Sequence, residues 1–404
     1  MTAVTVCVFY CRFTNLYCLD WNLIKFKGFL YTFITVRAVA YVYAAAFCLL
    51  IFKYKFIYWG YKMLFVLFLL LFAAVIIPKI YFIMEENRRV KQNVSKVYNK
   101  ITESKISENE YDVIINVPGS TEAGFNISAS RFDVKEPRAV VYVVHGALEH
   151  RGRYRDFIKF LNQEGFAAVS ADCRGHGKSI DSNYPAGYMR SLNEMIEDMY
   201  AVTEYIKSSY PSLDIYMFAH SMGSMFARHY LAGHDIEIKK LVLSGVVGYK
   251  AASPIGVWIS EFITFYRGKY SHSLTLGALN GMEGEDRSWI SINKKNLENI
   301  ENDPLVLKVF RNMADKVVFE ANMRLAKVKN YKAINTALKI LCISGDQDGA
   351  ITGGEKGLLY TINSLHSMGY RNVKNIVYEN MRHEVLNETD NKKVYNDILQ
   401  FYKK

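Results

Sequence analysis

The chain has 404 residues, half of them hydrophobic and 22% charged, so it can bury one large core and still carry added segments. Its formal net charge is +11, but residues 1–110 hold 14 Lys/Arg against 6 Asp/Glu, which leaves only +3 for residues 111–404. The basic excess therefore surrounds the apolar N-terminal segments, where it suits contact with anionic lipid, and the near-neutral remainder argues against a nucleic-acid-binding protein.

Two apolar stretches lie near the N-terminus. Phe29–Phe52 is long enough to cross a bilayer but contains Arg37, which is costly at mid-membrane. Met63–Pro78 has no charge and the apolar character continues beyond it, so the roughly 20 residues that a bilayer core requires are available. We therefore expect an uncleaved transmembrane anchor at residues 63–84, preceded by an extension at residues 1–62 that could hold a second membrane segment. Basic residues flank both ends of the anchor, so its orientation is left open.

A folded domain is expected from Tyr111 onward, after a polar and charged stretch at residues 85–110 that we predict to be a linker. Strand-like runs alternate with helical stretches, which predicts a mostly parallel sheet flanked by helices. The expected strands are Tyr111–Val117, Ala123–Val134, Ala139–Val144, Phe166–Ala171, Ile215–Phe218, Leu241–Ser244, Ile340–Ser344 and Val373–Tyr378. Residues 251–336 lack a buried-strand run and are rich in aromatics. We predict that they form a helical cap between two halves of the core, 111–250 and 337–404.

A serine stands between a predicted strand and a predicted helix in the segment A-H-S-M-G, residues 219–223. The small residues at its ends permit a sharp turn, so Ser221 should project over the end of the sheet at a helix N-terminus. A serine hydroxyl needs a base to remove its proton, and a histidine base needs an acid to orient it. His383 follows the last predicted strand, and Asp348 follows the strand before it, with Asp346 as the alternative acid.

Hydrogen-bond donors must also meet the negative charge that develops on an attacked carbonyl oxygen. The N–H of Met222 is one candidate, because it begins the helix after Ser221. The loop after Ala139–Val144 should supply the other, for which we select the N–H of Ala147. The six cysteines form no C-x-x-C pair and no histidine motif has metal-ligand spacing, so the sequence predicts no metal site and no disulfide framework.

Five segments in order carry a family pattern: H-G-A-L-E-H-R-G-R-Y (145–154), D-C-R-G-H-G-K-S (172–179), A-H-S-M-G-S (219–224), G-D-Q-D (345–348) and R-H-E-V-L-N-E (382–388). Together they resemble the monoacylglycerol lipase and lysophospholipase family of α/β hydrolases over roughly residues 111–404. The resemblance implies an α/β-hydrolase fold with an inserted cap, the same triad and oxyanion donors, and no cofactor. Ala219 and Ser224 replace glycines that are usual in the family's elbow, and a membrane anchor is not general to the family.

These features predict a membrane-anchored serine hydrolase that cleaves carboxylic esters of monoacylglycerol or lysophospholipid through an acyl-enzyme. The cap aromatics Trp258, Phe262 and Trp289 would contact the substrate. Two alternatives remain: a peptidase or small-ester hydrolase with the same triad, and a membrane-tethered binding protein without activity. Lipid-like esters and the membrane are the expected partners, with neither nucleic acid nor metal. The sequence leaves acyl-chain length, head group and oligomeric state open.

Overall fold

The computed structural model describes residues 59–404 except residues 93–99, 120–123, 282–285 and 329. The apolar stretch Phe29–Phe52 lies outside the described residues, as does nearly all of the extension expected at residues 1–62. The chain divides into two compact units between Ile77 and Pro78.

Helix α3 (Trp59–Gln92) crosses the boundary between the two units. Within it, Leu64–Glu86 is long and apolar enough to span a membrane, with a mean hydropathy of 2.6. Large apolar side chains of this segment are exposed, among them Leu64 and Phe65. By length and composition, this helix fits the anchor predicted at residues 63–84.

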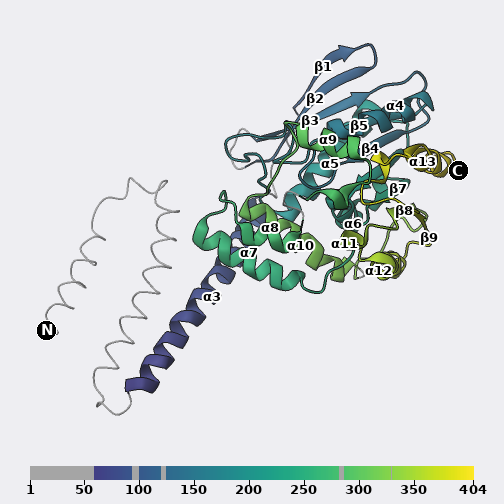
Figure 1. The fold of residues 1–404 in the computed structure, drawn as a ribbon. Helices are drawn as coiled ribbons and strands as arrows, with labels where there is room; N and C mark the ends of the chain where they lie inside the picture. Colours follow the sequence, from purple (N-terminus) through teal and green to yellow (C-terminus); the bar gives the residue numbers. More distant parts are fainter. Residues whose placement is uncertain (1–58, 93–99, 120–123, 282–285, 329) are drawn as a thin grey trace, which may run out of the picture. The chain divides into compact units, whose positions relative to one another are not determined.

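The second unit is built on one nine-stranded sheet with the order β1-β2-β3-β5-β4-β6-β7-β8-β9 (Figure 1). The strands are β1 (Ile101–Ser107), β2 (Glu110–Val117), β3 (Phe125–Phe132), β4 (Val140–Val144), β5 (Ala167–Ala171), β6 (Ile215–His220), β7 (Lys240–Ser244), β8 (Lys339–Gly345) and β9 (Asn372–Tyr378). The pairs β1–β2, β2–β3 and β3–β5 are antiparallel, and every other neighbouring pair is parallel. The fold class expected from the sequence is therefore confirmed.

All the predicted strands are present, with ends within two residues of those expected. Strand β1 was not expected. All seven of its residues are exposed, so no alternation of apolar and polar side chains marks it in the sequence. The stretch predicted as a linker at residues 85–110 therefore holds the end of α3 and an additional edge strand.

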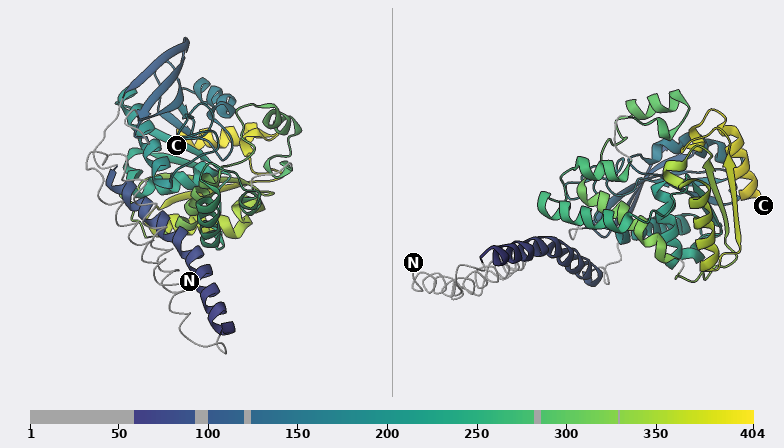
Figure 2. Two further views of the ribbon diagram at one scale, coloured as in Figure 1. Left: turned by 90° about the vertical axis from the view of Figure 1, so that its left-hand side faces the viewer. Right: turned by 60° about the horizontal axis from the view of Figure 1, so that its bottom comes forward.

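Helices cover both faces of the sheet (Figure 2). They are α4 (Arg155–Gln163), α5 (Leu192–Ser209), α6 (Met222–His234), α12 (Gly354–Met368) and α13 (Asn391–Lys403), with the short η5 (Arg151–Tyr154), η6 (Asp235–Glu237), α11 (Gly349–Thr352) and η8 (Val385–Asn387). Val141 and Val143 of β4 pack with α4 and α13, whereas Tyr142 and Val144 pack on the opposite side with α5 and α6. Burial on both faces explains why β4 reads as an unbroken apolar run.

The segment predicted as a cap lies between β7 and β8. Its helices are α7 (Ser253–Arg267), α8 (Leu274–Asn280), η7 (Ser288–Ile290), α9 (Lys294–Asn302) and α10 (Asn312–Val328). Helix α7 packs on α10, and α10 packs on α6 of the core. Figure 1 shows α7, α8 and α10 grouped together and α9 apart from them. The cap thus has two helical parts, joined by residues that include η7.

The second unit begins with the last turns of α3, which pack on the cap. Lys79 Nζ lies 2.9 Å from the Glu261 carboxylate of α7, whose side chain is only 6% exposed. The Tyr81 ring meets the Phe265 ring edge to face at 5.4 Å between centroids. Phe82 is buried in the main hydrophobic core. After Pro78 the helix is therefore an integral part of the second unit.

Candidate active site

Loops from four parallel strands meet at one edge of the sheet. Strand β4 leads into residues 145–150, β6 into Ser221, β8 into Asp348 and β9 into His383. Since parallel strands present their carboxyl ends on the same side, residues far apart in the chain converge there. This edge is where open α/β sheets generally bind ligands.

Ser221 lies in a strained turn. Its φ is 52°, in the left-handed region that residues other than glycine seldom adopt, and α6 begins at the next residue. The Ser221 N–H donates to the Ser244 carbonyl of β7 at 2.9 Å, which holds the turn in place. A Cβ at Gly223 would lie 2.6 Å from the His145 carbonyl oxygen, so only glycine allows this approach of α6 to the β4 loop. A strained backbone conformation such as that of Ser221 is typical of turns at functional sites.

The three residues predicted as a triad form one hydrogen-bonded chain. His383 Nε2 lies 2.8 Å from Ser221 Oγ, and His383 Nδ1 lies 2.9 Å from Asp348 Oδ2. All three side chains are buried. The alternative acid, Asp346, instead accepts a hydrogen bond from the Met381 N–H at 3.3 Å. The structure therefore brings Ser221, His383 and Asp348 together, and Asp346 takes no part in their hydrogen-bonded chain.

The pKa values of two neighbouring histidines at this edge, His383 and His220, are shifted in opposite directions. Burial alone would lower the pKa of His383, but the Asp348 carboxylate outweighs it and raises that pKa above 6.5. Burial and the nearby His383 lower the pKa of His220 to about 4. The two rings lie 4.8 Å apart between centroids. His220 is therefore neutral near pH 7, whereas His383 is well suited to hold a proton.

The predicted oxyanion donors lie next to the serine. Ala147 lines the same pocket as Ser221, and Met222 is the first residue of α6, where helix N–H groups lack intrahelical partners. His145 fixes the loop before Ala147. Its Nε2 accepts from the Cys173 N–H at 2.8 Å, so its Nδ1 carries the proton and donates to the Gly146 carbonyl at 2.8 Å.

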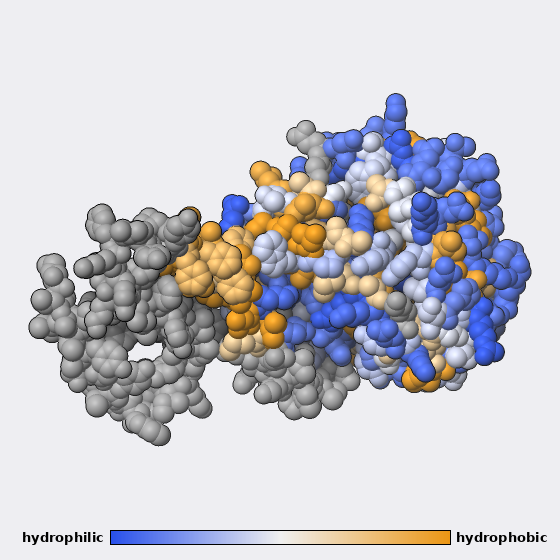
Figure 3. Space-filling model, turned by 90° about the horizontal axis from the view of Figure 1, so that it is seen from below, coloured by the Kyte–Doolittle hydropathy of each residue, from blue (hydrophilic) through white to orange (hydrophobic). Residues whose placement is uncertain are grey.

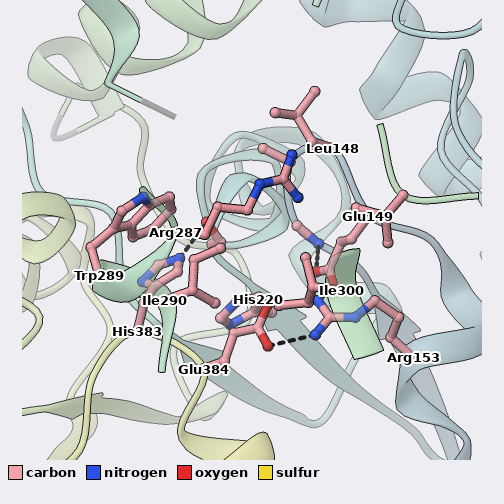
Figure 4. Close-up of a pocket in the computed structure, with 14 residues that line it drawn as sticks. Leu148, Glu149, Arg153, His220, Arg287, Trp289, Ile290, Ile300, His383 and Glu384 are labelled. Carbon is pink, nitrogen blue, oxygen red and sulfur yellow. Dashed lines mark hydrogen bonds and ion pairs between the residues drawn. The ribbon is translucent and has the colours of Figure 1, made fainter. Parts of the chain in front are cut away.

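A charged network that the sequence reading missed lies beside the triad (Figure 4). Arg153 donates to Glu384 at 2.6 and 2.7 Å and to Glu149 at 2.8 Å. Glu149 in turn accepts from the Gly146 N–H at 2.5 Å and from the Tyr154 hydroxyl at 2.6 Å. The network links the Ala147 loop to the His383 loop. The only sequence signal was the charge spacing within H-G-A-L-E-H-R-G-R-Y.

The cap is hydrogen-bonded directly to the histidine loop. The Glu388 carboxylate accepts from Ser291 Oγ at 2.8 Å and from the Ile292 N–H at 3.1 Å, both in the cap. It also accepts from the Arg382 N–H at 2.9 Å, one residue before His383. The position of the His383 imidazole is thereby coupled to that of the cap.

Of the three aromatic residues expected to contact substrate, one lines the pocket. Trp289 lies beside the His383 ring, 5.3 Å between centroids (Figure 4). Trp258 and Phe262 do not line this pocket and are exposed on α7. The pocket is lined by Gly146, Ala147, Leu148, Glu149, Arg153, His220, Ser221, Arg287, Trp289, Ile290, Ile300, Val306, His383 and Glu384.

Comparison with known families agrees with this geometry. A family model described as serine aminopeptidase, S33 (Hydrolase_4) matches residues 135–390, which is more than half of the chain. The chain belongs to this family of α/β hydrolases. The matched range runs from just before β4 to just before α13, so it contains the four loops and the cap.

Relatives of this α/β hydrolase include lipases and an esterase. A monoacylglycerol lipase of Mycolicibacterium smegmatis is 26% identical over 268 residues, covering 66% of this chain and 88% of the relative. A monoglyceride lipase homolog of monkeypox virus is 26% identical over 259 residues, covering 63% and 84%. A thermostable carboxyl esterase from Bacillus coagulans, solved with glycerol, superposes with a TM-score of 0.65 at 26% identity, covering 74% and 99%.

No group of three or more His, Cys, Asp or Glu residues with metal-binding geometry occurs in the described part of this α/β hydrolase. Cys173 and Cys342, the cysteines that the structure describes, are free thiols. Burial raises the pKa of the Cys342 thiol to about 12 and raises the pKa of the Cys173 thiol well above its ordinary value, so neither is a thiolate near neutral pH.

Proposed function

We propose that this protein is a membrane-anchored serine hydrolase that cleaves the carboxylic ester of a lipid carrying one acyl chain. The observation that carries the proposal is the hydrogen-bonded chain from Asp348 through His383 to Ser221. An alcohol, an imidazole and a carboxylate in that order are the parts that nucleophilic acyl transfer requires.

The mechanism follows from these positions. His383 Nε2 takes the proton of Ser221 as Oγ attacks the ester carbonyl carbon, and Asp348 stabilises the imidazolium that forms. The N–H groups of Ala147 and Met222 donate to the oxyanion. His383 then gives its proton to the leaving alcohol oxygen, and an ester of Ser221 remains. Water, deprotonated by His383, attacks this acyl-enzyme and releases a fatty acid and the free serine.

A lipid-like acyl group is supported by the pocket wall. Leu148, Ile290, Ile300 and Val306 supply aliphatic side chains close to Ser221. Apolar walls with a few placed polar groups are the usual composition of a site for an apolar ligand. The relatives named above are lipases and a carboxyl esterase, which supports the same substrate class for this chain.

A membrane location is supported by α3 and by the cap. Ile255, Trp258, Phe262 and Tyr266 recur at helical spacing on α7, and they are 60%, 44%, 37% and 52% exposed. Figure 3 shows hydrophobic residues on the face that carries α7. The last turns of the candidate span contact α7 through Lys79. An exposed apolar stripe such as that of α7 is suited to contact with a lipid surface.

Labelling with a fluorophosphonate probe tests the nucleophile. The wild-type chain in detergent should be labelled, Ser221→Ala should not, and both should melt at similar temperatures. Ser367→Ala, which alters an exposed serine of α12, is the matched control and should be labelled like the wild type. Labelling of Ser221→Ala at the wild-type rate would overturn the proposal.

A panel of substrates distinguishes a lipid esterase from a peptidase. Monoacylglycerol, lysophospholipid, p-nitrophenyl butyrate and aminoacyl p-nitroanilides present the same carbonyl chemistry with different flanking groups. We expect the highest kcat/KM on the two lipid esters. Preferential cleavage of the anilides would instead assign the chain a peptidase function. A correctly folded chain that is neither labelled nor active on any ester would be a binding protein.

Membrane anchoring has its own test on the full chain. We expect the wild type to remain in the membrane pellet after alkaline carbonate extraction. Leu67→Lys combined with Leu71→Lys places two charges in the apolar span and should release it. Leu359→Lys, an exposed position on α12, should remain in the pellet. Extraction of the wild type by carbonate would contradict the anchor.

A further inference from the structure

Arg287 brings an additional cation to the catalytic pocket. It directly precedes η7 in the cap and lines the same pocket as Ser221 and His383. Its side chain is half-buried. Figure 4 shows it extending across the pocket in the direction of Leu148 and Glu149. A guanidinium in this pocket can pair with a carboxylate of the protein or with an anionic group of the substrate.

The two arginines of the pocket differ in how their charge is balanced. Arg153 lies between Glu384 and Glu149, and these carboxylates outweigh burial and raise its pKa above the ordinary value for arginine. Arg287 has one hydrogen bond, from its guanidinium to the Leu307 carbonyl at 3.3 Å, and no carboxylate within ion-pair distance in the described part of the chain.

Burial and the like charge of Arg153 lower the pKa of Arg287, and the more distant Glu301 and Glu384 do not compensate. Among the described residues, its guanidinium is thus hydrogen-bonded to the Leu307 carbonyl only. Arginine presents five donors in a planar fork that matches carboxylate and phosphate oxygens. No carboxylate among the described residues occupies this guanidinium, so an anion that enters the pocket could pair with it.

The acyl chain of a lipid ester carries no charge, so only the leaving-group side of the ester can bring an anion to Arg287. We propose that Arg287 binds a phosphate on the glycerol of the substrate, which makes an anionic lysophospholipid the preferred substrate over uncharged monoacylglycerol. This inference rests on the proposed serine-esterase function. The phosphate takes no part in bond changes: water adds across the ester, and the products are a fatty acid and a glycerophosphate.

Two substrates that differ only in the phosphate test the inference. They are 1-oleoylglycerol and 1-oleoyl-lysophosphatidate, at the same mole fraction in mixed detergent micelles. We expect a higher kcat/KM for the phosphate-bearing ester in the wild type. Because a hydrogen-bonded charged group contributes more than a neutral one, Arg287→Gln should lower that value about tenfold or more, mainly through KM. The value for 1-oleoylglycerol should change less than about twofold.

Matched variants separate charge from structure. Arg287→Lys keeps the charge but loses the fork, so it should fall between wild type and Arg287→Gln. Arg371→Gln removes an exposed arginine next to β9 and should behave like the wild type on both esters. Glycerol 3-phosphate should inhibit wild-type hydrolysis of 1-oleoylglycerol more strongly than glycerol does. Arg287→Gln should abolish this difference.

The possible failures are distinguishable. If the wild type hydrolyses both esters equally, or if Arg287→Gln lowers both values by the same factor, the phosphate site is wrong and the esterase function stands. If the wild type hydrolyses neither ester and Ser221 is not labelled, the esterase function fails and the phosphate site fails with it.

Discussion

The guanidinium of Arg153 donates to both carboxylate oxygens of Glu384, at 2.6 and 2.7 Å. Glu384 directly follows His383, and Arg153 also holds Glu149, which fixes the Gly146 N–H beside Ala147. One buried cation therefore sets the spacing between the proposed base, His383, and the proposed oxyanion donor, Ala147.

Removal of the Arg153 guanidinium should lower the stability of the fold. Arg153→Met leaves Glu384 and Glu149 buried without their partner, which we expect to destabilise the fold by about 3–5 kcal/mol. The same variant should react more slowly with a fluorophosphonate, since both loops lose their link. Thermal unfolding in detergent and labelling rates measure the two effects.

A solvent-exposed ion pair provides the control for the buried ion pairs of Arg153. Lys403 and Glu164 form a surface pair at 2.7 Å, with side chains 33% and 35% exposed. Lys403→Met should cost less than about 1 kcal/mol because water already solvates both groups. Equal losses of stability in Lys403→Met and Arg153→Met would show that the buried network has no special role.

Activity should depend on pH through His383. The imidazole must be neutral to accept the serine proton, so kcat/KM should rise as pH rises through its pKa. Since Asp348 raises that pKa, the midpoint should lie above 6.5. Asp348→Asn removes the main raising contribution, so the midpoint should move to lower pH while the rate falls by roughly 10⁴-fold. Initial rates between pH 5 and pH 9 on a soluble ester measure both changes.

A histidine away from the pocket checks that assignment. His366→Gln lies on α12 and should leave the pH profile unchanged. An unmoved midpoint in Asp348→Asn would mean that a group other than His383 controls the acidic limb.

Glu388 should connect the cap to the rate of the reaction. Glu388→Ala removes the acceptor for donors from both the cap and the histidine loop, and stranded buried donors cost about 1–3 kcal/mol each. We expect a lower melting temperature and a lower kcat with little change in KM. Glu388→Gln keeps one acceptor oxygen and should be intermediate. Glu379→Ala, an exposed position just after β9, should match the wild type, and a fully active and stable Glu388→Ala would refute the coupling.

The sequence was most informative where one physical rule dominates. Buried strands such as β4 are continuously apolar, and parallel strands deliver their following loops to one edge, so the meeting of Ser221, Asp348 and His383 at that edge could be predicted. Asp346 could not be excluded from the sequence, because two residues of one turn differ in direction only once the backbone is known.

The sequence alone did not predict, or predicted incorrectly, the features that depend on neighbours in three dimensions. Strand β1 is exposed along its whole length and resembles a polar linker. Trp258 and Phe262 were assigned to the substrate because they are aromatic, yet the face of α7 that they occupy does not line the pocket. That Arg287 has no carboxylate within ion-pair distance among the described residues can be recognised only from the positions of those residues.

Substitution by alanine should lower the stability of the fold at Gly345 and raise it at Gly233. A Cβ at Gly345, at the end of β8, would overlap the Met381 carbonyl oxygen, and the backbone of the histidine loop would have to move. Gly345→Ala should therefore destabilise the fold by about 2 kcal/mol or more and slow labelling of Ser221. In Gly233, near the end of α6, a Cβ would meet nothing within 4 Å. Gly233→Ala should stabilise the helix by about 0.5–1 kcal/mol and leave labelling unchanged. Equal stability and equal labelling of the two variants would mean that the close approach of β8 to the histidine loop does not position the catalytic base.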